Sequence, residues 1–268
     1  MTFWSGPEGP WLWAGLTAYG LAAALAPAAV SGDRRARPWV LALLGTGVGA
    51  YGVLIALRWY RAGQGPFLTM FEILVSNLFS LGLILAAVCW RSPAARPAAL
   101  FAAPVLALLG VWALVVPAGI VPLPPTYDNN WLWVHVAMGK VFLGVLLVAA
   151  GLSVALLCRR AGRLRGLPEE AAIAVWKYAA VAFVFESLML VAGAIWAQDA
   201  WGRYWDWDPL ESWAFATWLA LAATLHARLT LRWPDWSFQT MIVGVFALAF
   251  LTFFGVPFLS IAPHKGAV

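Results

Sequence analysis

The chain has 268 residues and a formal net charge of +5, and 63% of its residues are hydrophobic while only 11% are charged. Soluble domains contain roughly 25% charged residues, so this composition excludes an ordinary soluble protein and indicates an integral membrane protein. The basic residues lie in short clusters between apolar runs, a distribution that membrane topology explains better than a nucleic-acid partner does.

Apolar runs long enough to cross a membrane recur along the whole chain. A helix needs about 20 apolar residues to span the hydrocarbon core. Eight runs meet this requirement, at residues 11–30, 38–57, 67–89, 98–117, 132–157, 171–197, 212–231 and 238–259. The first contains Pro27 and the fourth contains Pro104, but neighbouring helices can satisfy the backbone groups that a proline frees. We therefore expect an all-α integral membrane protein, a single domain of residues 1–268 with about eight transmembrane helices.

The arginines predict how this bundle is oriented. They cluster in every second connection, as Arg34, Arg35 and Arg37, then Arg91 and Arg96, then Arg159, Arg160, Arg163 and Arg165, then Arg228 and Arg232. Basic loops remain on the cytoplasmic side. Both termini and the connection between the sixth and seventh helices are therefore predicted to lie on the outer face.

That sixth connection is the most unusual stretch of the chain, and we call residues 198–213 the tryptophan-rich loop. Within the thirteen positions 201–213 are four tryptophans, Trp201, Trp205, Trp207 and Trp213, interleaved with Arg203, Asp206, Asp208 and Glu211. One tryptophan at a membrane edge is ordinary anchoring, but four among fixed charges exceed that need. An aromatic surface of this kind suits a planar, mostly apolar ligand with ionised groups at its rim, and haem fits that description.

Two of the three histidines are predicted to lie on the same face as this loop. His135 is just inside the outer end of the fifth helix, and His264 follows the eighth. Two neutral imidazoles on opposite sides of haem iron form a closed, six-coordinate site. The alternative for each is an interfacial histidine with a satisfied hydrogen bond.

The third histidine lies deeper. His226 follows Ser212 by fourteen residues, or about 21 Å of helical rise, which places it in the inner half of the membrane. An ionisable group at that depth is costly, so we expect it to face the bundle interior or a cavity. A second, inner haem site is one interpretation, but its other ligand would come from another protein or from a weaker ligand of this chain.

Three further ionisable residues are predicted within helices, namely Glu72, Lys140 and Glu186. Each is either a buried structural partner or a functional group, and Lys140 follows His135 closely enough to pair with an acidic group of a ligand. Phosphate-binding glycine loops, H-E-x-x-H and serine-hydrolase patterns are absent from the sequence, which excludes the nucleotide-binding and hydrolase classes that they mark.

The pattern Trp201-Gly202-x-x-Trp205-x-Trp207-Asp208-x-x-Glu211 resembles the WWD motif of a superfamily of haem-handling membrane proteins in cytochrome c biogenesis, which includes CcsA/ResC, CcmC and CcmF. The Asp208-Pro209 step with Glu211 is most similar to the CcsA branch. With the stretches that lead to His135 and His264, the resemblance covers about residues 58–264.

The resemblance implies a role in the System II pathway with a CcsB-like partner, as a subunit of a holocytochrome c synthase in the bacterial inner membrane. Such proteins move haem outward and present it on the periplasmic face for thioether attachment to the CxxCH cysteines of apocytochrome c. By the same resemblance His135 and His264 are the outer axial ligands and His226 an inner ligand. The loop residues that it assigns to haem binding are Trp201, Gly202, Arg203, Tyr204, Trp205, Trp207, Asp208 and Glu211. The alternatives are a haem chaperone of the CcmC kind, which transfers haem without attaching it, and a scaffold without a cofactor.

Three positions depart from the family pattern. Asp206 adds a negative charge inside the motif, Gln64 stands where many relatives have histidine, and His264 lies in an unusual local sequence. The sequence offers no physical account of Asp206.

Overall fold

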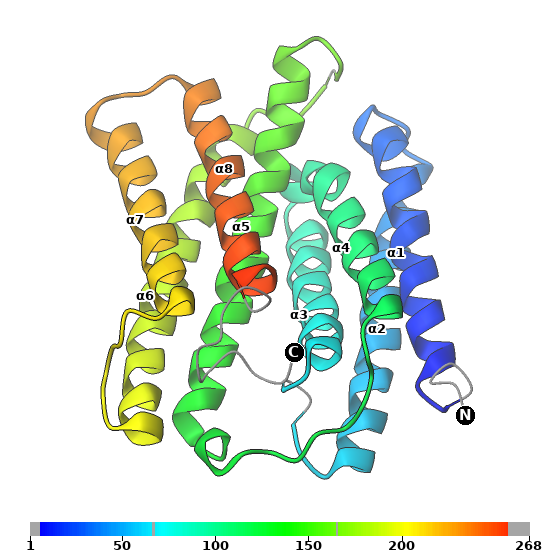
Figure 1. The fold of residues 1–268 in the computed structure, drawn as a ribbon. Helices are drawn as coiled ribbons and strands as arrows, with labels where there is room; N and C mark the ends of the chain where they lie inside the picture. The colour runs from blue at the N-terminus through cyan, green and yellow to red at the C-terminus, as the bar shows by residue number, and fades with distance from the viewer. Residues whose placement is uncertain (1–5, 66–67, 165, 257–268) are drawn as a thin grey trace.

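The computed structural model describes residues 6–65, 68–164 and 166–256, and they form helices in every region that was predicted to be helical. The long helices are α1 (Gly9–Val30), α2 (Ala36–Ala62), α3 (Met70–Arg91), α4 (Ala99–Val115), α5 (Asn130–Arg160), α6 (Ala171–Trp201), α7 (Pro209–Thr230) and α8 (Asp235–Phe254). Two short 3₁₀ helices, η2 (Pro93–Ala98) and η3 (Pro125–Tyr127), precede α4 and α5. Figure 1 shows the long helices side by side in one bundle.

Successive helices run in opposite directions, so their connections gather at two ends of the bundle. The connections α2–α3, α4–α5 and α6–α7 lie at the lower end in Figure 1, and the connections with the arginine clusters, α1–α2, α3–α4, α5–α6 and α7–α8, lie at the upper end. Arg203 is the arginine of the α6–α7 connection. The segregation predicted from the arginines is therefore present. We call the lower end, which carries the tryptophan-rich loop, the tryptophan end; its position on the outer face of a membrane stays a prediction.

Seven of the helices in the described part of the chain are long and apolar enough to cross a membrane. The exception is α7, because Glu211, Thr217, Thr224, His226 and Arg228 dilute its apolar residues. The predicted all-α membrane bundle is confirmed, with α7 as its most polar member.

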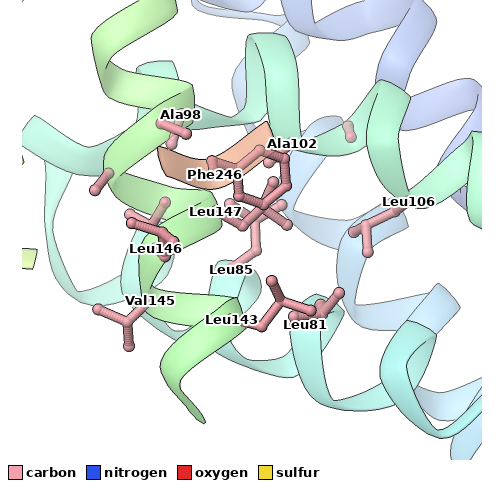
Figure 2. Packing of buried hydrophobic residues seen from close by; sticks show 14 of the residues in the cluster. Leu81, Leu85, Ala98, Ala102, Leu106, Leu143, Val145, Leu146, Leu147 and Phe246 are labelled. Carbon is pink, nitrogen blue, oxygen red and sulfur yellow. The ribbon is translucent and has the colours of Figure 1, made fainter. Parts of the chain in front are cut away.

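Helix α5 lies at the centre and packs against α3, α4, α6 and α8. Its residues 142–153 are all buried, as expected of a helix that is apolar on every side. Figure 2 shows leucines of α5 among side chains of α3, α4 and α8, labelled Leu143, Leu146 and Leu147, then Leu81 and Leu85, then Ala102, Leu106 and Phe246. Gly151 lets α5 approach η2, because a β-carbon there would collide with the carbonyl oxygen of Ala98.

Neither internal proline ends its helix. Helix α1 continues past Pro27 to Val30, and α4 continues past Pro104 to Val115. Helix α1 packs against both α2 and α4, so each proline-containing helix has neighbouring helices along its length.

A buried ionic network joins three helices at the tryptophan end. Arg58 of α2 is 1% exposed; its Nε donates to Glu72 at 2.9 Å, and Nη1 contacts Glu8 at 3.2 Å. Its guanidinium also donates to the carbonyls of Ala118 and Gly119 at 3.1 and 2.6 Å. Glu72, in turn, accepts the backbone N–H of Thr69 in the capping box of α3. Glu72 is therefore a structural partner, the first of the two alternatives for the membrane carboxylates.

Gln64 holds the connection between α4 and α5 in place. Its Nε2 donates to the carbonyl of Val121 at 2.5 Å, and its Oε1 accepts the N–H of Leu123 at 2.8 Å. The amide group of Gln64 thus bonds one backbone carbonyl and one backbone N–H of this connection, as a neighbouring β-strand would. This gives a physical role to a position that departs from the family pattern.

Candidate functional site

The side chain of His135 is held by backbone groups of α6. Its Nδ1 lies 2.9 Å from the carbonyl oxygen of Met189, which can only accept a hydrogen bond. Nδ1 therefore carries a proton in this contact, and when the ring is neutral the lone pair is on Nε2. Histidines that bind metals are commonly fixed by the same kind of hydrogen bond through their other nitrogen. The contact thus sets His135 in the form that a metal ligand requires.

Gly193 of α6 makes room for this imidazole. A β-carbon at position 193 would lie 2.7 Å from Nδ1 and 2.9 Å from Cε1 of His135. Any other residue at this position would therefore push the ring away from α6. Trp196 lies on α6 one turn beyond Gly193, toward the tryptophan end. It stacks on the His135 ring with a centroid distance of 6.0 Å and an interplanar angle of 25°.

Trp196 is the centre of one aromatic group. It is 4% exposed, and it meets Tyr127 at 5.4 Å and Trp201 at 4.9 Å, both in edge-on geometry. Its indole N–H donates to the carbonyl of Thr126 at 3.0 Å. The first tryptophan of the WWD pattern therefore packs with His135 through Trp196, a residue that the sequence analysis did not single out.

Trp205 and Trp207 belong to a second aromatic group. Both pack edge-on against Phe215 of α7, at 6.1 and 6.0 Å, and Phe215 stacks on Trp218 with an interplanar angle of 11°. Trp218 stacks in turn on Phe183 of α6. The tryptophans of the loop thus form two groups instead of the single flat surface that the sequence suggested.

The charged residues of the loop mainly fold the loop itself. Gly202 ends α6 with φ +75°, a conformation that glycine adopts without a side-chain clash. Asp208 begins α7, because its carboxylate accepts the N–H of Glu211 at 2.9 Å. Glu211 accepts the N–H of Asp206 at 2.7 Å. Trp207, between these residues, has φ +57°, which is uncommon outside glycine.

Asp206 also forms an ion pair with Arg203 at 2.8 Å, with side chains 42% and 56% exposed. The acidic residue inside the motif is therefore neutralised by a cation three positions earlier. The structure supplies the physical account that the sequence lacked.

A pocket with a cavity volume of about 230 Å³ opens between these two aromatic groups. Of the predicted site residues it is lined by His135, Trp201, Tyr204, Trp205 and Glu211, and it is not lined by Gly202, Arg203, Trp207, Asp208 or His226. The lining also includes Tyr127, Met189, Gly193 and Trp196. The one available signal for Trp196 was its position five residues before Trp201, near the end of the predicted sixth helix.

The part of the pocket farther from the tryptophan end carries polar groups. Ser76 and Asn77 of α3 and Lys140 of α5 line it, together with Thr252 of α8. Lys140 Nζ donates to Ser76 Oγ at 2.8 Å. We call Ser76, Asn77 and Lys140 the polar floor of the pocket.

Of the other two histidines, only His226 belongs to the described residues, and it does not line this pocket. His264 lies outside the described residues. His226 is exposed on α7, with Nδ1 3.4 Å from Thr230 Oγ1, so the expectation that it faces the bundle interior is wrong. Position 226 points away from α6 and α8 while its neighbours Leu225 and Ala227 are buried against them. A haem site in the inner half of the membrane that uses His226 would therefore form on the exposed side of α7 and not inside the bundle.

Glu186 is fully buried in α6, and neither carboxylate oxygen has a hydrogen-bond partner among the described residues. Lys177 of the same helix is exposed and makes no bond to Glu186. Glu186 does not line the pocket.

Comparisons with known proteins agree on the family of this fold. The family model for cytochrome C assembly proteins matches residues 49–264, most of the chain. The chain belongs to the cytochrome c assembly protein family. It is 30% identical over 249 residues to the cytochrome c biogenesis protein CcsA of Synechococcus sp. (strain CC9605), covering 79% of this chain and 81% of that protein. It is 28% identical to CcsA of Atropa belladonna, covering 79% of this chain and 80% of the relative.

A solved structure shares the fold. The cytochrome c haem lyase CcmF superposes with a TM-score of 0.75 at 18% sequence identity. The match covers 92% of this chain and 46% of CcmF, so this chain corresponds to about half of the larger protein. Family and fold together make this chain a multi-pass membrane protein of cytochrome c assembly, a family whose work implies the handling of haem.

Proposed function

We propose that this family member acts in System II cytochrome c biogenesis, where it moves haem across the bacterial inner membrane and presents it in the pocket beside the tryptophan-rich loop. The hydrogen bond between His135 and the Met189 carbonyl carries this proposal, because it leaves Nε2 as the basic nitrogen of a ring that lines the pocket. Both aromatic groups border the same pocket through Trp196, Trp201 and Trp205.

The pocket fits haem chemically and in part sterically. An imidazole ligand, indole faces and a cation at the polar floor match an iron, an apolar macrocycle and its carboxylates, respectively. The cavity volume of about 230 Å³ is below the roughly 300–1,000 Å³ of most small-molecule sites. Haem binding therefore requires the loop to move outward or part of the macrocycle to remain in the mouth.

His264 is the proposed second axial ligand, since it follows α8, whose Phe253 lines the pocket. Haem supplies the vinyl groups to which the CxxCH thiols of apocytochrome c add. This chain's part is to hold the iron, position the macrocycle and exclude water while a CcsB-like partner completes the synthase. The pocket would open on the periplasmic face, in agreement with the arginines at the opposite end of the bundle.

Spectroscopy of the purified full chain tests the haem site. We expect a six-coordinate, low-spin absorbance spectrum that is lost in His135→Ala and restored by added imidazole. His264→Ala should behave in the same way, and His226→Ala should leave the spectrum of this pocket unchanged. Haem content and spectrum that are unchanged in both His135→Ala and His264→Ala would rule out the assignment.

Reconstitution with a CcsB-like protein and an apocytochrome separates the synthase from a haem chaperone. Covalent c-type haem on the apocytochrome supports the proposal. Transfer of haem to an acceptor without a thioether would instead assign this chain to the chaperone class.

A further inference from the structure

Lys140 lies in the interior of the bundle and pairs with no acidic residue in the described part of the chain. It lies on α5, five residues beyond His135, or about 7.5 Å farther along the helix from the tryptophan end. Its ammonium donates to the neutral hydroxyl of Ser76 at 2.8 Å, and none of the ion pairs among the described residues includes it. Placing a lysine at this depth is costly unless an anion compensates it.

A second group at the polar floor lacks a partner. Asn77 is 3% exposed, and its Nδ2 donates to the carbonyl of Ile73 at 2.8 Å. Its buried Oδ1 has no hydrogen-bond partner in the described part of the chain. Buried polar atoms are nearly always bonded, so this oxygen indicates that a polar group or its water is bound there. The ammonium of Lys140 suits a carboxylate, and a water that accompanies the carboxylate would supply the donor that the amide oxygen of Asn77 requires.

The charges of the pocket differ between its two ends. Glu211 is the acidic residue of the tryptophan-rich loop that lines the pocket, whereas Asp206 and Asp208 belong to the loop but do not line it. Lys140 provides the positive charge at the floor. An anionic group that enters this field is drawn away from the mouth and toward the floor.

On the basis of the proposed function, we propose that Lys140 binds an ionised propionate of haem and thereby orients it, with the propionate edge at the polar floor and the vinyl edge at the tryptophan-rich loop. His135 lies between the two ends along α5, as the iron lies between the two edges of the macrocycle. This orientation places the vinyl groups beside Trp201, Tyr204 and Trp205, where incoming thiols have access from the mouth. Lys140 is thus a positioning residue for the substrate.

The opposite orientation has one candidate anchor. The indole Nε1 of Trp205 is buried without a hydrogen-bond partner among the described residues, so it is a donor at the other end of the pocket. The indole N–H of Trp205 is neutral, and carboxylates of the loop lie close to it in sequence. The ammonium of Lys140, by contrast, offers a full positive charge. The experiment compares the two directly.

The test is equilibrium binding of two probes, iron protoporphyrin IX and its dimethyl ester, to the purified full chain. Esterification removes the propionate charges and leaves the macrocycle and vinyl groups intact. We expect the wild type to prefer the free acid by about 10- to 100-fold, the effect of one hydrogen bond between charged groups. Lys140→Met should remove this preference through weaker binding of the acid, with unchanged affinity for the ester and an unchanged His135-dependent spectrum.

Three variants complete the comparison. Lys140→Arg should retain most of the preference, and Lys177→Met, which removes an exposed lysine of α6, should retain all of it. Trp205→Phe should also retain it. The inference is overturned if the wild type binds acid and ester equally, if Lys140→Met keeps the preference, or if the preference is lost in Trp205→Phe instead.

A second readout does not depend on the folding of Lys140→Met, because it compares the wild type with Lys140→Arg. The propionate bending bands in the resonance Raman spectrum of the bound haem should shift when Lys140→Arg replaces the ammonium, because the hydrogen bond changes. Bands that are identical in the two proteins would contradict the inference. If neither probe gives a His135-dependent spectrum in the wild type, the proposed function fails first, and that result is distinct from a failure of the orientation alone.

Discussion

The imidazole of His135 packs against the backbone of Gly193 so closely that a β-carbon at position 193 would lie 2.7 Å from Nδ1. Gly193→Ala should therefore displace the ring and weaken its hydrogen bond to Met189. We expect haem affinity to fall by about tenfold or more, comparable to the 10- to 100-fold cost of losing a partner that orients a metal ligand. Titration of the purified variant with haem, followed at the Soret band, measures this effect.

Gly244→Ala is the matched control for that variant. Gly244 lies within α8, and nothing is within 4 Å of a β-carbon placed there. This substitution should leave haem affinity unchanged and increase stability by about 0.4–1 kcal/mol. Equal loss of affinity in both glycine variants would show that the contact with His135 is not the cause.

Asp208 should stabilise α7 whether or not haem is present. Its carboxylate caps the first turn through the N–H of Glu211. Asp208→Ala should cost about 0.5–2 kcal/mol, whereas Asp208→Ser, which restores a capping oxygen, should cost much less. Thermal unfolding of the haem-free protein gives the comparison. A haem affinity that is lost in Asp208→Ser with stability retained would instead indicate direct contact with the ligand.

The ion pair between Arg203 and Asp206 should contribute little to stability. Because both side chains are about half exposed, we expect a coupling energy below about 1 kcal/mol from a double-mutant cycle of Arg203→Gln and Asp206→Asn, and smaller still at high salt. The measurement is the unfolding midpoint of the four proteins at two salt concentrations. A coupling that is larger and independent of salt would mean that the pair is shielded from water.

Arg58 should be the most sensitive position of the α1–α3 region. Arg58→Met removes the cation and leaves Glu8 and Glu72 buried without it. Breaking a buried pair in this way costs about 3–5 kcal/mol. The exposed Arg61, which also contacts Glu8, provides the control, because Arg61→Met should cost far less in the same unfolding assay. Similar losses in the two variants would place the burial of Arg58 in doubt.

The helices could be predicted from sequence because their physical cause is local. A run of about 20 apolar residues fixes a spanning helix regardless of its neighbours, and the prolines at 27 and 104 did not alter this. The orientation of single side chains could not be predicted in the same way. His226 is exposed although its depth favoured the interior, because the face it occupies depends on how α7 packs at the edge of the bundle.

The candidate site was predictable only in part for a related reason. The tryptophan pattern identified the loop, and His135 was identified by residue type. Trp196, Gly193 and Asn77 reach the pocket through the packing of α3, α5 and α6, and none of them has a distinctive local sequence. Asp206 and Gln64 were recognised as departures, but their partners, Arg203 and the backbone of 121–123, became evident only in three dimensions.

Helix α6 runs without interruption from Ala171 to Trp201, and it carries the carbonyl of Met189, the cleared position Gly193 and the indoles of Trp196 and Trp201. These groups therefore keep fixed positions relative to one another. Bending within α6 would break the contacts of Met189, Gly193 and Trp196 with His135. The nearest hinge is Gly202, with its left-handed backbone. We therefore expect any movement that admits a ligand to pivot at Gly202, displacing Tyr204 and Trp205 while His135 keeps its contacts with α6.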